Sequence, residues 1–187
     1  GEDVISRMVY ASKGGADELR GLVLGTIDGL VEIACKRAKA SPELIVKAAV
    51  AGNSTMMHLL LGIPADNIRL APFITAVNHV PMLTARDVGL SINPEATVDC
   101  LPGVASYVGA DITAGVLSSG TDEADKETLF IDVGTNGEIV LGTREWLAAC
   151  ACSAGPAFEG AGVLDGMRAT TGAIEEVWIN ADTFEAL

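Results

Sequence analysis

The sequence is poor in aromatic and basic side chains. Aromatic residues make up 4% of its 187 positions, and 12 Lys and Arg stand against 25 Asp and Glu, for a net charge of −13 at pH 7. An acidic chain repels phosphate backbones and anionic lipid headgroups, and few aromatic rings leave little surface on which bases can stack. We therefore expect no nucleic acid and no membrane among the partners.

Long apolar runs and clustered cysteines are missing as well. No run of about 18 apolar residues occurs, so no transmembrane helix is predicted, and the acidic N-terminus lacks the apolar segment of a signal peptide. The cysteines form no C-x-x-C pair and lie far from both histidines in sequence, which argues against a zinc or iron–sulfur site. We expect a cytoplasmic protein with reduced thiols in an apolar core. These thiols belong to Cys35, Cys100, Cys150 and Cys152.

Hydrophobic residues make up 49% of the chain, which is enough to bury a core. Their spacing is helical in some segments and strand-like in others. Helices are predicted over 2–12, 16–40, 56–61 and 106–117. Strands are predicted over 46–51 (buried), 97–101, 129–131, 139–142, 146–151 and 174–179. Because both halves mix the two kinds of element, the pattern predicts an α/β protein.

Two stretches carry little regular pattern. Residues 63–96 contain four prolines and are predicted to form an irregular excursion with short strands. Residues 121–128 carry five charges, which predicts a solvated loop and a boundary between the two halves of the chain.

The strongest chemical signal is the segment DVGTNGE at 132–138, which lies between two apolar segments. Glycines at a bend let a ligand approach backbone N–H groups, and several converging N–H groups bind an anion. Asp132, at the end of a predicted strand, is placed to hold Mg²⁺ directly or through water beside a polyphosphate. The alternative is a plain tight hairpin, for which Asn-Gly is the strongest turn signal.

Polar residues also occur near two predicted helix starts. Gly52, Asn53 and Ser54 follow a predicted strand, and the N-terminus of the next helix favours an anion; a plain Asn/Ser cap is the alternative. Asp111 follows Gly109 at the start of another helix, where a carboxylate stabilises the helix dipole. His58 lies in an apolar helical run, which favours a core histidine over a ligand.

Several segments, in this order, resemble one family of the actin, sugar-kinase and Hsp70 superfamily. They are AGNSTMMHLLLG at 51–62, VGADITAG at 108–115, the hairpin at 132–138 and SAGPAFEG at 153–160. The family is the ATP-dependent reductive activators of corrinoid proteins. The resemblance implies an actin-like ATPase (RNase H-like) fold, present in part, with portions of two lobes: residues 1–120 from the first and 121–187 from the second.

The resemblance also assigns roles to residues. It implies that ATP and Mg²⁺ bind, that Asp111 orients the attacking water or helps to hold Mg²⁺, and that Asp132 holds Mg²⁺. Glu138, Gly155 and Glu159 are expected to line the cleft, although Glu159 is equally well explained as a structural cap. The expected phosphate contacts are Asp132, Gly134, Thr135, Asn136, Gly137, Gly52, Asn53 and Ser54.

The implied function is an ATPase module that couples ATP hydrolysis to the reduction of cob(II)alamin to cob(I)alamin on a corrinoid protein of a methyltransferase system. Family members also carry a domain with a two-iron two-sulfur cluster that this sequence lacks, so we expect a fragment. Two alternatives remain open. One is a small-metabolite phosphotransferase with Asp111 as its base, and the other is a non-catalytic domain that docks a partner or forms a homodimer.

Overall fold

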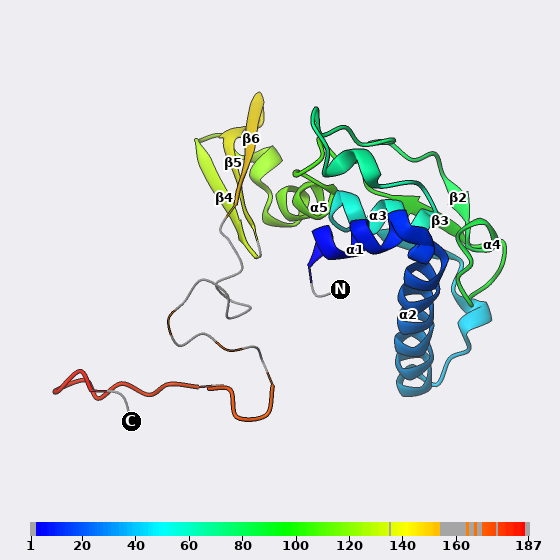
Figure 1. Ribbon diagram of the computed structural model, residues 1–187, viewed down its shortest axis with the longest axis horizontal. Helices are drawn as coiled ribbons and strands as arrows, with labels where there is room; N and C mark the ends of the chain where they lie inside the picture. The colour runs from blue at the N-terminus through cyan, green and yellow to red at the C-terminus, as the bar shows by residue number, and fades with distance from the viewer. Residues whose placement is uncertain are drawn as a thin grey trace. The chain divides into compact units, whose positions relative to one another are not determined.

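The structure is a computed structural model that describes residues 3–134, 136–153, 164, 167, 170–174 and 176–185 (Figure 1). The chain divides into two compact units. The first comprises Gly1–Asp132 and Glu138–Ala151, and the second comprises Val133–Gly137 and Cys152–Leu187. Among the described residues, no helix is long and apolar enough to span a bilayer.

The first unit opens with two helices, drawn in blue in Figure 1. Helix α1 (Val4–Tyr10) begins at Asp3, whose carboxylate accepts a hydrogen bond from the Ser6 amide over 2.8 Å. A five-residue π-helical turn leads into α2 (Ala16–Ala38), which ends at Lys39 in the left-handed conformation. Acidic residues occupy the first turn of α2 and basic residues the last, as the helix dipole favours. The predicted long helix is therefore confirmed.

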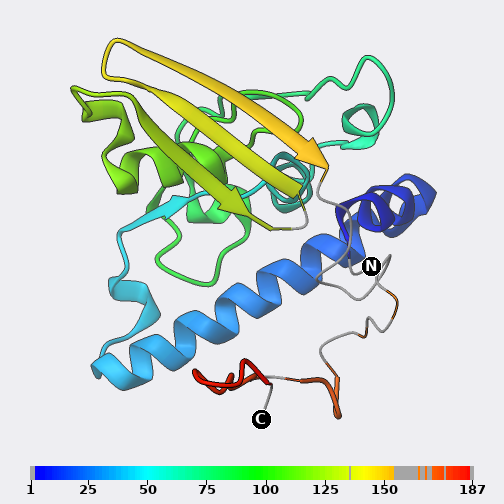
Figure 2. The ribbon, with the colours of Figure 1, turned by 90° about the vertical axis from the view of Figure 1, so that its left-hand side faces the viewer.

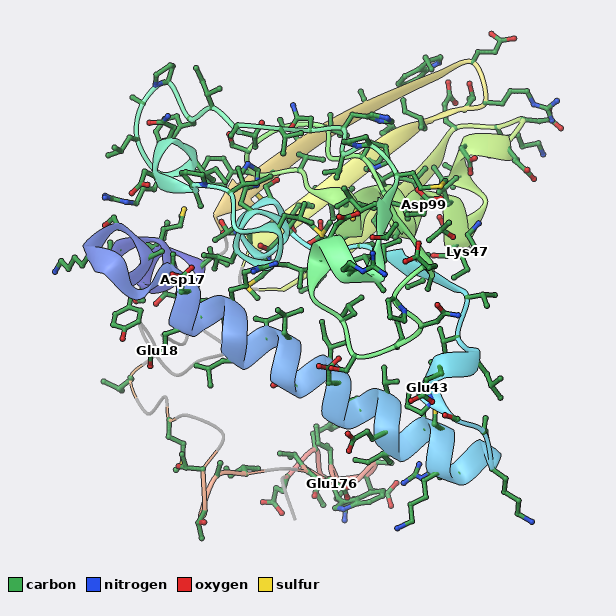
Figure 3. All side chains as sticks on the ribbon, turned by 90° about the vertical axis from the view of Figure 1, so that its right-hand side faces the viewer. Asp17, Glu18, Glu43, Lys47, Asp99 and Glu176 are labelled. Atoms are coloured by element: carbon green, nitrogen blue, oxygen red, sulfur yellow. The ribbon has the colours of Figure 1, made fainter. Side chains whose placement is uncertain are left out.

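A three-stranded sheet follows, in the order β1-β3-β2. Strands β1 (Lys47–Val50) and β3 (Thr97–Cys100) are parallel, and β2 (Leu83–Thr84) is antiparallel to β3. Figure 3 shows Lys47 and Asp99 on the neighbouring strands β1 and β3. The predicted strand at 46–51 forms, but its predicted burial is wrong because β1 lies at the sheet edge, with Lys47 and Ala49 exposed.

The main core lies between this sheet and its helices. Helix α3 (Ser54–Leu61) contributes Met57 and Leu60, and α2 packs Val23 and Leu24 against them. The Arg20 guanidinium on α2 joins two helix ends by donating to the carbonyl oxygens of Leu60, over 2.9 Å, and Val88, over 2.8 Å.

The stretch at 63–96 is less irregular than expected. It contains β2 and the short helix α4 (Ala85–Val88), whose Thr84 and Asp87 form a reciprocal capping box. Ala85, Val88 and Ile92 are buried in the main core. The helix was not predicted because one turn is too short for a helical period to be recognised.

The last described elements are α5 (Ala110–Ser119) and a second sheet in the order β4-β5-β6 (Figure 2). The strands are β4 (Thr128–Val133), β5 (Asn136–Thr143) and β6 (Trp146–Ser153), which confirms the three strands predicted here. Within the first unit, Ile112 and Val116 of α5 pack with Phe130 and Val140 of the sheet. Helix α5 begins later than predicted because residues 105 and 108 pair across a tight turn.

The predicted solvated loop at 121–128 is confirmed for its charged part, where Glu123, Asp125, Lys126 and Glu127 are exposed, although Thr121 is buried. Two further expectations are wrong at least in part. No strand forms at 174 or 176–179, the described part of the predicted strand at 174–179. Cys35 and Cys100 are buried as expected, but Cys150 and Cys152 are exposed because they lie on an uncovered face of β6.

Candidate functional site

Two of the predicted site segments meet in the first unit. A Cβ atom at Gly109 would lie 2.7 Å from the Ser54 amide nitrogen and 2.8 Å from the Asn53 Cα, so only glycine allows this approach. The Asp111 amide donates to the Gly52 carbonyl oxygen over 3.3 Å. The turn after β1 and the start of α5 are thus joined backbone to backbone, although they are distant in sequence.

The start of α3 is a well-formed cap. Asn53 Oδ1 accepts a hydrogen bond from the Met56 amide over 2.9 Å, and the buried Ser54 hydroxyl donates to the Ala105 carbonyl oxygen over 3.0 Å. Asn53 is thus the N-cap of α3. A cap of this kind also places the free amides of the first helical turn at the Gly52–Ser54 turn, where an anion is favoured.

Asp111 is a half-buried acid in the first turn of α5. Burial raises its pKa above the ordinary value of 3.8, and the nearby Asp132 charge acts in the same direction. The Ile112 amide, 3.0 Å from Asp111 Oδ1, acts in the opposite direction. The carboxylate is therefore held in a setting that disfavours its charge.

Asp132 and Glu138 lie on the side of the second sheet that α5 covers. Residues alternate between the two faces of a strand, so Asp132 shares a face with Phe130, and Glu138 shares one with the buried Val140. Burial raises the pKa of Glu138, and the charges of Asp132 and then Asp111 add to the effect. Three carboxylates in the first unit thus repel one another, which a cation would relieve.

The donor set can be compared with what Mg²⁺ requires. In the described part of the chain, no group of three or more His, Cys, Asp or Glu side chains could hold a metal ion. Magnesium in phosphate sites typically uses one or two carboxylates and takes its other ligands from water and phosphate oxygens. Asp111 and Asp132 fit that requirement in kind and number, and their charges are near enough to interact.

The hairpin tip belongs to the second unit. The Gly134 amide donates to the Asn136 carbonyl oxygen over 2.9 Å, and β5 begins at Asn136. The predicted Asn-Gly turn is therefore wrong in position: Asn136 and Gly137 lie in the strand. The Cys152 thiol contacts the Gly137 carbonyl oxygen over 3.1 Å. Among the predicted site residues, Thr135, Gly155 and Glu159 lie outside the described part of the chain.

His58 is a core histidine, as predicted, with 1% of its surface exposed. Sequence reasoning missed its contact with residue 76, because no local period links the two positions. It likewise missed the contact between Ser54 and residue 105.

The α/β architecture is that of a class of actin-like proteins, the ASKHA domains, and the family models agree. Residues 126–187 match the model described as the C-terminal domain of RACo, the ASKHA domain. Residues 1–124 match the model described as the RACo middle region. The chain belongs to the RACo family.

The similar proteins are all named as activators or reductases that act on corrinoids or corrinoid proteins. The corrinoid activation enzyme RamQ of Eubacterium limosum is 41% identical over 181 residues, which are 95% of this chain and 30% of that protein. The [Co(II) methylated amine-specific corrinoid protein] reductase of Methanosarcina barkeri is 36% identical over 76 residues, 41% of this chain and 14% of that protein. A solved structure titled reductive activator for corrinoid, iron-sulfur protein matches all of this chain and 30% of its own, at 49% identity and a TM-score of 0.84. The chain thus spans less than a third of these relatives.

Proposed function

We propose that this chain is part of the nucleotide-binding module of an ATP-dependent reductive activator of corrinoid proteins. The observation that carries the proposal is the junction in the first unit, where the Gly52–Ser54 turn meets the start of α5 at Gly109 and Asp111. The names of the relatives, which are corrinoid-activating or cobalt-reducing proteins, supply the substrate class.

The residues take the following roles in this proposal. Asp111 accepts a hydrogen bond from the attacking water and orients it, because its carboxylate lies half-buried at a helix start. Asp132 and Asp111 would hold Mg²⁺, which neutralises phosphate charge when bound. Glu138, whose charge interacts with theirs, would line the cleft beside them. The phosphate contacts would come from Gly52, Asn53 and Ser54, and from Gly134, Thr135, Asn136 and Gly137 of the hairpin that directly follows Asp132 in sequence.

The domain assignment is part of the same proposal. Residues 1–120 would form a portion of the first actin-like lobe, and 121–187 the start of the second. Closure of two such lobes on a nucleotide is a hinge motion of a common kind. A two-iron two-sulfur cluster would belong to a separate domain of the longer protein. The partner would be a corrinoid protein, whose cobalt(II) is hard to reduce until nucleotide-driven contacts change its surroundings.

The test uses the full-length protein that contains this chain, in its cluster-loaded form, with a cob(II)alamin corrinoid protein and a low-potential electron donor. Cob(I)alamin, followed by its absorbance, should form only when Mg·ATP is present. An Asp111→Asn variant should bind the partner but form little cob(I)alamin, whereas Asp122→Asn, in the neighbouring acidic segment, should behave as wild type. ATP turnover without cob(I)alamin, accompanied by a phosphorylated metabolite, would instead identify a phosphotransferase.

We also propose that the protein forms a homodimer. The small and exposed apolar residues on the outer face of α2 support this part of the proposal. Gly21, Gly25 and Gly29 lie four residues apart, and a Cβ atom at any of them would meet no heavy atom of the described residues within 4 Å. Leu22 and Ile33 on the same face are 61% and 51% exposed. Such a face allows a second helix to approach closely.

The charges on this face favour a second copy in antiparallel orientation. A two-fold axis passing between Gly25 and Gly29 would place Glu18 of one copy opposite Lys36 of the other, and the pair would occur twice. Figure 3 shows Glu18 near the N-terminal end of α2. Analytical ultracentrifugation of the full-length protein should show a dimer that Glu18→Lys weakens and that the Glu18→Lys, Lys36→Glu double variant restores. A monomeric wild type would rule this part out.

A further inference from the structure

His58 makes a hydrogen bond with each of its two ring nitrogens. Nδ1 lies 2.6 Å from the Ser54 carbonyl oxygen, and Nε2 lies 3.1 Å from the Ala76 amide nitrogen. A carbonyl oxygen only accepts and an amide N–H only donates, so Nδ1 carries the proton and Nε2 is the acceptor. The ring is therefore neutral and held in one tautomer.

The segment at 73–78, which contains Ala76, is held from its other side too. The Gly103 amide donates to the Asn78 carbonyl oxygen over 2.8 Å, and the Ser106 hydroxyl donates to the Phe73 carbonyl oxygen. Thr75 donates to the Asn78 side chain over 2.7 Å within the segment. The segment thus lies between α3 and the turn at 103–108, with its backbone bonded to both.

These bonds form a closed ring of contacts that returns to the candidate site. The Ser54 hydroxyl donates to the Ala105 carbonyl oxygen in the same turn, which then leads through Gly109 to Asp111. The space left inside the ring is a cavity of about 20 Å³, lined in part by Ser54 and His58, which is room for about one water molecule. His58 is thus linked to the turn at 103–108 through hydrogen bonds on both sides of the segment at 73–78.

We propose that His58 is a positioning residue: by joining the segment at 73–78 to α3 through its neutral Nδ1–H tautomer, it fixes the Gly52–Ser54 turn against Gly109 and Asp111. The inference rests on the proposed function, because the turn matters for activity only if it contacts a nucleotide. Burial lowers the pKa of His58, in keeping with a ring that stays neutral.

Two substitutions of similar shape distinguish the hydrogen bond made by Nδ1 from the one made by Nε2. Glutamine can place an acceptor oxygen near the Nε2 position and keep the bond from the Ala76 amide. Asparagine can reach only the Nδ1 position and keep the bond to the Ser54 carbonyl oxygen, while leucine keeps neither. His79, the other histidine and an exposed one, is the matched control position.

The experiment measures Mg·ATP affinity by calorimetry and backbone hydrogen exchange at 73–78 in the full-length protein. His58→Leu and His58→Asn both lose the part-buried bond from the Ala76 amide. We expect both to bind Mg·ATP about five- to tenfold more weakly and to exchange faster at Ala76. His58→Gln should stay within about twofold of wild type because the bond is kept, as should His79→Leu. Imidazole ¹⁵N shifts of the wild type should show the Nδ1–H tautomer for the signal that is lost in His58→Gln.

Several outcomes would overturn the inference. One is equal Mg·ATP affinity in wild type and folded His58→Leu; another is the Nε2–H tautomer; a third is a glutamine variant as weak as the leucine variant. If His58→Leu does not fold, Ser106→Ala removes a bond on the other side of the segment and should weaken binding in the same direction; unchanged affinity there counts against the inference. If the wild type binds no Mg·ATP, the proposed function is wrong, and exchange at 73–78 still shows whether His58 holds the segment.

Discussion

The backbone amide of Asp111 donates to the carbonyl oxygen of Gly52 over 3.3 Å. This single bond joins the end of β1 to the start of α5 and places an acid beside a helix-start turn. In the proposed nucleotide site, the acid would help to hold Mg²⁺ and the helix-start amides would contact phosphate.

Gly109 makes this junction possible, so Gly109→Ala should damage it. The new methyl group would lie 2.7 Å from the Ser54 amide nitrogen, so the backbone must shift. Overpacking of this kind costs about 1–3 kcal/mol of unfolding free energy, which urea denaturation would measure. We also expect weaker Mg·ATP binding.

Gly25→Ala is the matched control for that substitution, with both variants measured at a protein concentration at which the protein is monomeric. In the described part of the chain, its methyl group would meet nothing within 4 Å on the outer face of α2. Alanine is the better helix former, so unfolding free energy should stay the same or rise by up to about 1 kcal/mol. A Gly109→Ala protein as stable as the Gly25→Ala protein would contradict the close approach.

Asp111→Asn should separate stability from activity. Because burial raises the pKa of Asp111 above 3.8, the folded state binds a proton more tightly than the unfolded state, and stability falls as pH rises from 3.8 through the folded pKa. At neutral pH the charge is therefore a cost that asparagine removes. The variant should be at least as stable as wild type to heat, yet hydrolyse ATP about 10²-fold more slowly.

Equal losses of stability and ATP turnover in Asp111→Asn would show that Asp111 is only a structural acid. The gain in stability that asparagine gives at neutral pH should be absent at pH 3, where both proteins carry a neutral group at this position.

Gly115 and Phe130 set the contact between α5 and the acid-bearing face of the second sheet. A Cβ atom at Gly115 would lie 2.3 Å from Phe130 Cζ, so Gly115→Ala should lower the unfolding free energy by about 1–3 kcal/mol. Phe130→Leu removes the ring that clashes. In a double-mutant cycle, the second substitution should therefore reduce the cost of the first; strict additivity would mean that the two residues are not in contact.

His58 should give the fold a pH dependence of defined sign. Its pKa is lowered from 6.5 chiefly by burial, so the unfolded chain takes up a proton at a pH at which the folded chain does not. Stability should therefore decline as pH falls from 6.5 to the folded pKa, and level off below it. His58→Gln should remove this slope and His79→Gln should leave it; a slope retained in His58→Gln would assign it to another group.

Much of the local structure could be predicted from the sequence, because periodicity and caps are local. Helix α2 and the β4–β5 hairpin follow from apolar spacing, and His58 was recognised as a core residue from its apolar neighbours. The exposure of β1 could not be predicted, because it depends on which strands lie beside it.

The candidate site was predicted only as separate pieces. The turn at 52–54 and Asp111 were each identified from local patterns, but their contact depends on Gly109 packing against Asn53, which involves segments far apart in sequence. The hydrogen bond between His58 and Ala76 is of the same kind. Contacts between segments that are far apart in sequence produce no repeating pattern of residues from which they could be predicted.

The most direct test of the central claim is calorimetric titration of Mg·ATP into the full-length protein, beside Asp132→Ala and the control Glu127→Gln. Glu127 lies in the neighbouring acidic segment and is exposed. The account predicts saturable binding by the wild type and the control, and no binding by Asp132→Ala. Absence of binding by the wild type at millimolar nucleotide, or undiminished binding by Asp132→Ala, would contradict it.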